Sequence, residues 1–143
     1  MAKWHHEKHI VSFYECDPSR TVHNSKYFIW FENARFEIAK ESNLDSYIEK
    51  LQEEKGDLLL FPVLEAECKF LLPIPLGTKL ILRTKLEKPK AAKLVFKHVI
   101  TGELDGKDYG TATTVVGILS SKRGLLISLN EDIQKLINDY IDS

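Results

Sequence analysis

An acidic residue and a predicted helix start lie close together near the beginning of the sequence. Asp17 is followed by Pro18 and by a polar loop that runs to Asn24, and a helix is predicted from about Ser25 to Glu41. A carboxylate can act as a nucleophile or as a general base, and a helix start carries unpaired N–H groups and a partial positive charge. Asp before Pro also starts many ordinary turns, so a purely structural role for Asp17 stays open.

The predicted helix is apolar nearly all round in its first half. Its inward stripe repeats at spacings of four, three and four residues and is widened by further aromatic side chains: Tyr27, Phe31, Ala34 and Ile38, with Phe28 and Trp30. Such a helix is normally buried. Capping at its start is supplied by His23, Asn24 and Ser25.

Other residues near this stretch could do chemistry but have simpler interpretations. His5, His6 and His9 have a spacing that could hold a metal ion on a helix, but the segment is more typical of a strand or a terminus, which favours adventitious binding only. Cys16 has no histidine partner placed by spacing and is expected to be a small buried filler. His23 lies in the loop beside Asp17, where a cap is the more common role than an acid-base group.

The composition excludes several classes of protein. A chain of 143 residues fits one domain, here taken as 1–143, with a real core. A net charge of -1 gives no basic field for nucleic acid or for an acidic membrane surface. Two cysteines are too few for a disulfide framework, and no signal core or membrane-length apolar run is present. We therefore expect a reduced, cytoplasmic protein without membrane insertion.

The rest of the chain predicts one antiparallel sheet and two more helices. A short amphipathic helix is predicted over 44–54, and from there the apolar period changes to two. Strands are predicted over 9–14, 64–70, 79–87, 94–101 and 109–121, and a closing helix over 130–142. The expected fold class is α+β, with the antiparallel sheet wrapped around the long apolar helix.

Three blocks of the sequence, in order, resemble a known family. They are FYECDPSRTVHNSKYFIWFENARFE, FPVLEAECKFLLPIPLGTKLILRTKLEK and GKDYGTATTVVGILSSKRGLLISLNEDI. The first contains an Asp in a turn, a Tyr at the helix start and an aromatic-acidic-x-Ala-Arg pattern. The second contains a strand that begins Val63-Leu64-Glu65, and the third a last strand that turns into a C-terminal helix. Together they resemble the hotdog-fold acyl-CoA thioesterases of the 4-hydroxybenzoyl-CoA thioesterase type.

The resemblance implies a hotdog fold and hydrolysis of an acyl-CoA thioester without a metal or redox cofactor. It implies that Asp17 is the nucleophile or general base and that a backbone N–H near Asn24 polarises the thioester carbonyl. Tyr27 matches the family's Tyr, and His23 lies beside the implied site. The acyl pocket then depends on which aromatic side chains turn inward, the candidates being Phe28, Trp30, Phe31 and Phe61.

The sequence departs from the family pattern at three positions of the loop. The family usually has Gly at the position of Arg20, a ring residue at Asn24 and Asn at Lys26. Without the Gly, a changed path of the loop is expected. Arg20 and Lys26 could instead contact a substrate carboxylate or a phosphate of coenzyme A.

Basic residues on neighbouring strands suggest how the substrate is held. Their ordinary interpretation is a solvated sheet face whose edges are guarded by Lys. The resemblance favours binding of the coenzyme A phosphates by Lys88, Lys90 and Lys93, in a site formed between the subunits of a homodimer or homotetramer. The alternatives are a thioesterase for acyl-carrier protein and a hotdog protein that binds acyl-CoA without catalysis.

Overall fold

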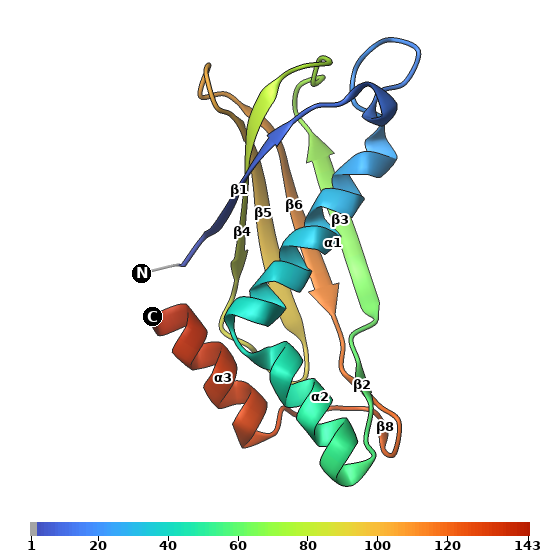
Figure 1. Cartoon of the computed structure of the whole chain (residues 1–143), viewed down its shortest axis with the longest axis vertical. Coiled ribbons are helices and arrows are strands. Elements are labelled where there is room, and N and C mark those ends of the chain that lie inside the picture. Colours follow the sequence, from blue (N-terminus) through green and yellow to red (C-terminus); the bar gives the residue numbers. More distant parts are fainter. Residues whose placement is uncertain (1–2) are drawn as a thin grey trace.

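A five-stranded antiparallel sheet forms the body of the computed structural model, which describes residues 3–143 (Figure 1). Its strands lie in the order β1-β4-β5-β6-β3, so β1 and β3 form the two edges. In that order across the sheet, their bounds are His5–Ile10, Lys79–Leu86, Leu94–Gly102, Asp108–Val116 and Val63–Phe70. The predicted antiparallel sheet is confirmed.

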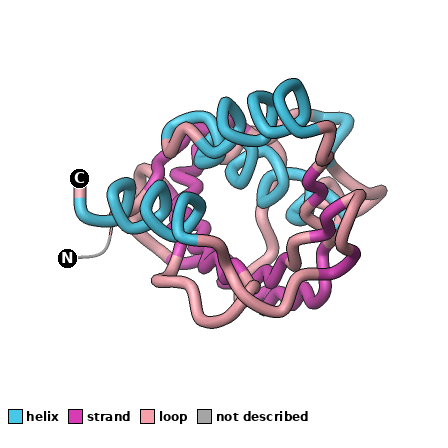
Figure 2. Tube along the Cα trace, turned by 90° about the horizontal axis from the view of Figure 1, so that it is seen from below, coloured by secondary structure: helices cyan, strands magenta, loops and turns pink. Residues whose placement is uncertain are grey.

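Three α-helices accompany the sheet in the described residues: α1 (Asn24–Glu41), α2 (Leu44–Lys55) and α3 (Glu131–Asp142). The first residue of each helix agrees with its prediction to within one position. In Figure 1, α1 runs along the sheet, while α2 and α3 lie toward its lower end. Viewed from below, the helices lie largely on one side and the strands on the other (Figure 2).

The period of two in the sequence places one face of the sheet against α1. Leu80, Leu82, Thr84 and Leu86 of β4 are all buried, while the residues between them are partly exposed, as predicted. Next to the start of α1, a cluster of buried residues joins the helix to strands β4, β5 and β6: Tyr27, Trp30, Phe31, Leu80, Leu82, Ile100 and Ala112.

A second buried cluster closes the other end of the sheet. It joins the end of α1 to α3 and to the ends of the strands through Ile38, Leu86, Leu94, Phe96, Ile133 and Ile137. Three short strands outside the main sheet form a second, small sheet in the order β2-β7-β8. Their bounds are Leu59–Leu60, Leu119–Ser120 and Gly124–Leu125.

The first and last strands differ from their predictions. The prediction of a strand over 9–14 is wrong, because β1 ends at Ile10 and Phe13–Glu15 forms a short 3-10 helix, η1. A capping box between Ser12 and Glu15 starts η1 and ends the ladder. The predicted strand over 109–121 is divided after Val116, where the Gly117 N–H donates to the carbonyl of Pro62 at 2.9 Å and the chain leaves for β7.

The expectation that α1 is buried is only partly met within a single copy of the chain. The helix buries the stripe that faces the sheet, but Phe28 is 39% exposed, Ile29 46% and Phe36 58%. A sheet covers only one side of a helix that lies on it, so these side chains remain uncovered.

Candidate active site

The loop that carries Asp17 is closed by its own backbone hydrogen bonds. The Asp17 N–H donates to the carbonyl of Thr21 and the Arg20 N–H to the carbonyl of Asp17, both at 2.9 Å. Arg20 has φ +64°, the left-handed conformation that glycine favours. Arg20 therefore adopts the conformation for which the family's glycine is suited, and the turn forms without it.

The carboxylate of Asp17 is held in place by hydrogen bonds from Ser19 of the same loop. Its Oδ1 accepts the Ser19 N–H at 2.9 Å and also the Ser19 hydroxyl. These hydrogen bonds, first of all the one from the hydroxyl, lower the pKa of Asp17 below its ordinary value. The group is therefore ionised at neutral pH and lies at the protein surface.

The start of α1 follows the loop directly. His23 is the N-cap, as predicted: its Nδ1 accepts the Ser25 N–H at 3.1 Å and its carbonyl accepts the Lys26 N–H at 3.0 Å. The Asn24 N–H makes no hydrogen bond within residues 3–143. An unpaired N–H at the positive end of an 18-residue helix is a suitable donor for an oxyanion.

Tyr27 lies beneath this helix start and belongs to the core. It is 3% exposed, and its ring meets Phe70 edge to face with 4.8 Å between the centroids. Burial, with a smaller contribution from Cys68, raises the pKa of Tyr27 to about 12. The phenol therefore stays protonated at neutral pH and cannot serve as a base.

The two basic residues of the loop differ in their surroundings. Arg20 is exposed. Lys26 is half-buried, with its Nζ 5.8 Å from the centre of the Tyr14 ring, and lines a small cavity of about 140 Å³ together with His9 and Glu15.

A larger, mostly apolar cavity of about 350 Å³ lies at the far half of α1. It is bounded by α1, α2 and the ends of β3, β5 and β6, and its lining is Glu32, Arg35, Phe36, Ala39, Leu44, Asp45, Ile48, Phe61, Val63, Leu94, Phe96 and Val116. Of the aromatic side chains considered in the sequence, Phe61 lines it, whereas Trp30 and Phe31 are buried in the core near the helix start. From Asn24 to Phe36 the helix rises by about 18 Å, so Asp17 and this cavity are well separated in one chain.

The predicted phosphate-binding lysines lie on the loop between β4 and β5. Ile10 pairs with Lys79 at the end of the sheet nearest the Asp17 loop, and β4 then runs about 23 Å to Leu86 before this loop begins. Lys88, Lys90 and Lys93 are exposed. Within one chain, the structure does not bring them together with Asp17.

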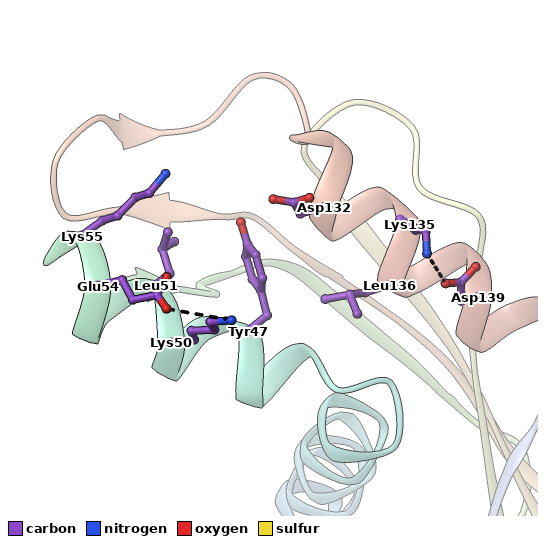
Figure 3. A pocket seen from close by; sticks show the side chains of 9 residues that line it. All are labelled: Tyr47, Lys50, Leu51, Glu54, Lys55, Asp132, Lys135, Leu136 and Asp139. Carbon is purple, nitrogen blue, oxygen red and sulfur yellow. Dashed lines mark hydrogen bonds and ion pairs between the residues drawn. The ribbon is translucent and has the colours of Figure 1, made fainter.

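A further hollow of about 420 Å³ lies between α2 and α3 (Figure 3). Tyr47 points into the gap between the helices, and its hydroxyl accepts a hydrogen bond from Asn130 at 3.0 Å. Lys135 and Asp139 on its rim form an ion pair at 3.4 Å. It lies at the opposite end of α1 from Asp17.

The N-terminal histidines lie on strand β1, so the helical spacing considered for a metal site does not apply. His5 and His9 face the helix side and contact Glu7 and Glu15, respectively, at 2.8 Å, whereas His6 is exposed on the other face. Within 3–143, no three His, Cys, Asp or Glu side chains converge as metal ligands would. No helix of this part of the chain is long and apolar enough to cross a membrane.

Comparison with known proteins gives the family. The model of the thioesterase-like superfamily matches residues 11–137, which include the Asp17 loop, α1 and the whole sheet from β3 onward. The chain belongs to the thioesterase-like superfamily. A protein of Aquifex aeolicus (strain VF5) is 24% identical over 129 residues, which cover 90% of this chain and 94% of that protein.

Solved structures described as thioesterases have the same fold. YbaW, a probable thioesterase of Escherichia coli, superposes with a TM-score of 0.82 at 18% identity, covering 95% of this chain and 98% of its own. Slr0204, a 1,4-dihydroxy-2-naphthoyl-CoA thioesterase from Synechocystis, gives 0.80 at 15% identity, covering 99% of both chains. The predicted hotdog fold is confirmed, and at these identities the likeness shows the fold alone.

One residue of the site region was missed by the sequence analysis. Glu15 is buried two residues before Asp17 and joins three elements through its carboxylate. The spacing of Ser12 and Glu15 is a capping-box signature, and it could have identified Glu15 as an inward-facing acid.

Proposed function

We propose that this protein, as one domain over residues 1–143, hydrolyses an acyl-CoA thioester to the free acid and coenzyme A. The observation that carries the proposal is the pairing of an ionised carboxylate, Asp17, with a free N–H, Asn24, at the two ends of one hydrogen-bonded loop. Membership of the thioesterase-like superfamily supports it.

In the proposed reaction, the thioester carbonyl oxygen accepts the Asn24 N–H while the carbonyl carbon faces Asp17. Either the carboxylate adds to the carbon and expels the coenzyme A thiolate, or it takes a proton from a water that adds in its place. In the first route, water then cleaves the acyl-aspartate anhydride and regenerates the carboxylate. In both routes, the helix start stabilises the oxyanion, and the thiolate leaves and is protonated. Tyr27 supports the helix start from below, and His23 caps it.

We propose further that the site is completed by a second copy of the chain. Within residues 3–143, the edge strand β3 pairs only with β6, and large apolar side chains on it and after it are exposed: Val63, Leu64, Phe70, Leu71 and Leu72. Phe36 of α1, which is exposed and lines one cavity with Val63, adds to this surface. An exposed apolar edge pairs readily with its own copy.

Two-fold antiparallel pairing of β3 with its copy would join the two parts of the site. It sets the Phe70 end of one strand beside the Val63 end of the other. The Asp17 loop lies over the Phe70 end, and the 350 Å³ cavity lies at the Val63 end. Each Asp17 would then face the apolar cavity of the other subunit, whose Phe36, Phe61 and Phe96 suit an aryl or medium-length acyl group, in keeping with the 4-hydroxybenzoyl-CoA type.

The same symmetry carries the loop between β4 and β5 of one subunit toward the Asp17 end of the other. Lys88, Lys90 and Lys93 would then contact the phosphates of coenzyme A from across the interface. These exposed lysines also favour a second candidate, an acyl-carrier-protein thioesterase, because they could bind an acidic carrier domain.

The test is thiol release from a panel of aliphatic and aromatic acyl-CoAs and acyl-carrier proteins, by wild type and by Asp17→Asn. We expect turnover of at least one acyl-CoA class and loss of most of that rate in the variant. Tight binding without turnover by the wild type would instead identify a non-catalytic protein. Faster turnover of the carrier-borne substrate would favour the second candidate. Sedimentation of the wild type and of Phe36→Asp tests the second copy, because a dimer that buries Phe36 is weakened by the charge.

A further inference from the structure

The carboxylate of Glu15 is buried and receives donors from three elements. It is 3% exposed. Its Oε1 accepts the Ser12 N–H and His9 Nε2, both at 2.8 Å, and its Oε2 accepts Trp30 Nε1 at 2.8 Å. Burial by itself raises the pKa of Glu15, but the hydrogen bonds from Ser12, His9 and Trp30 together outweigh it, so the net pKa is lowered and the group is ionised. The carboxylate thus ties η1 to β1 and to the second turn of α1.

The backbone of Glu15 holds the other end of the Asp17 loop. Its carbonyl accepts the N–H of His23, the N-cap of α1, at 2.8 Å. The next residue, Cys16, forms a bridge with Val22. Glu15 therefore lies two residues before the carboxylate of Asp17 and is bonded to the residue just before the Asn24 N–H. Both groups of the proposed site are fixed relative to this one buried side chain.

We infer that Glu15 is a positioning residue, which sets the Asp17 carboxylate against the N–H groups at the start of α1. Its consequence for catalysis rests on the proposed function. A buried carboxylate with several donors is rigid, because each donor loses a strong hydrogen bond if the group moves. A displacement of about 1 Å between reacting groups costs on the order of a hundredfold in rate, so the anchor matters for turnover although it never touches the substrate.

The variant Glu15→Gln keeps the size of the side chain and removes the match to its donors. The amide has one acceptor oxygen, and its NH₂ would face groups that themselves donate. The matched control is Glu7→Gln on strand β1, which breaks a similar contact, with His5 Nε2 at 2.8 Å, away from the loop.

The first readout is independent of activity. Amide hydrogen exchange followed by NMR reports the His23 and Arg20 N–H groups, which donate to Glu15 and Asp17 in the folded loop. We expect exchange at both to quicken by roughly tenfold or more in Glu15→Gln, with a shifted Trp30 indole resonance, and to stay at the wild-type rate in Glu7→Gln. Unchanged exchange in Glu15→Gln overturns the inference.

The second readout separates positioning from binding. With an acyl-CoA that the wild type hydrolyses, kcat of Glu15→Gln should fall by roughly tenfold or more while KM changes by less than about twofold. A wild-type kcat in Glu15→Gln, combined with an inactive Asp17→Asn, would overturn the inference and still support the proposed function. If the wild type hydrolyses nothing, the proposed function fails and the exchange measurement alone decides the positioning role.

A milder variant keeps the test decisive if Glu15→Gln does not fold. Trp30→Phe removes one donor to the carboxylate and leaves an aromatic ring in the core. The same readouts should change in the same direction by a smaller factor. Wild-type exchange and wild-type kcat in this folded variant would overturn the inference.

Discussion

Phe31 of α1 stacks on His98 of β5, with 4.3 Å between the ring centroids and 25° between their planes. His98 is 2% exposed, and its ring nitrogens contact the hydroxyls of Thr84 and Thr114 at 2.9 and 3.0 Å. Burial, with a smaller contribution from the Arg35 charge, lowers the pKa of His98 to about 3. The imidazole is therefore neutral under most conditions and is a structural part of the contact between helix and sheet.

This burial predicts a loss of stability in mild acid. Between the ordinary pKa of 6.5 and about 3, the unfolded chain binds a proton at His98 and the folded chain does not. Above pH 6.5, His98 is neutral in both states and its titration does not lower the stability of the fold. Between pH 6.5 and about 3, the free energy of unfolding falls by about 1.4 kcal/mol for each pH unit by which the pH is lowered. Urea unfolding at several pH values measures this slope. In His98→Gln the slope should be smaller by about that amount, and equal slopes for the two proteins would contradict the assignment.

The Ser19 hydrogen bonds predict how Asp17 titrates. They stabilise the ionised carboxylate, so its pKa lies below the ordinary value, and Ser19→Ala should raise it because the hydroxyl donor is lost. A carbon NMR titration of the Asp17 carboxyl group measures the shift directly. Ser128→Ala, at an exposed position, is the control and should leave the titration unchanged. A pKa in Ser19→Ala that equals the wild-type one would show that the hydroxyl contact is not formed in solution.

The left-handed backbone of Arg20 predicts a stabilising substitution. Glycine adopts φ +64° without the clash of a Cβ atom, although it also increases the conformational entropy of the unfolded chain. Arg20→Gly should therefore stabilise the fold by up to about 1 kcal/mol in denaturant unfolding. Ala91→Gly, at φ +57°, should behave in the same way. Ser128→Gly, which lacks a positive φ, should be neutral or destabilising, and a loss of stability in Arg20→Gly would contradict the strain argument.

Two isoleucines near the C-terminus give a matched test of packing. Ile137 of α3 is fully buried in the cluster at the end of the sheet, whereas Ile127 is 89% exposed. Ile137→Ala should reduce the free energy of unfolding by about 2–5 kcal/mol through lost burial and a residual cavity. Ile127→Ala should change it by less than about 0.5 kcal/mol. Similar effects of the two substitutions would show that α3 does not close the core as described.

The three helices, the long inner strands and the loop that carries Asp17 could be predicted from neighbouring residues alone. Alternation along β4, with Leu80, Leu82 and Leu86 inward, reflects a period that the strand backbone enforces without outside help. The helix start after His23 was equally predictable, because a cap bonds to N–H groups only a few residues away. Asp17 stood out for the same reason, since its distance from the helix start is short along the chain.

Contacts between residues far apart in the chain could not be predicted in this way. Glu15 became an anchor because β1 and α1 bring His9 and Trp30 to it, and neither contact has a local signature. The register of β4 placed Lys88 at the opposite end of the sheet from Asp17, although both had been assigned to one site. The exposure of Phe36 could not be predicted from the sequence either, because whether an apolar side chain is covered depends on which other segments pack against it. Short-range hydrogen bonding and periodicity depend on neighbouring residues and can be predicted from them. Burial and the assembly of a site depend on contacts between segments far apart in the chain.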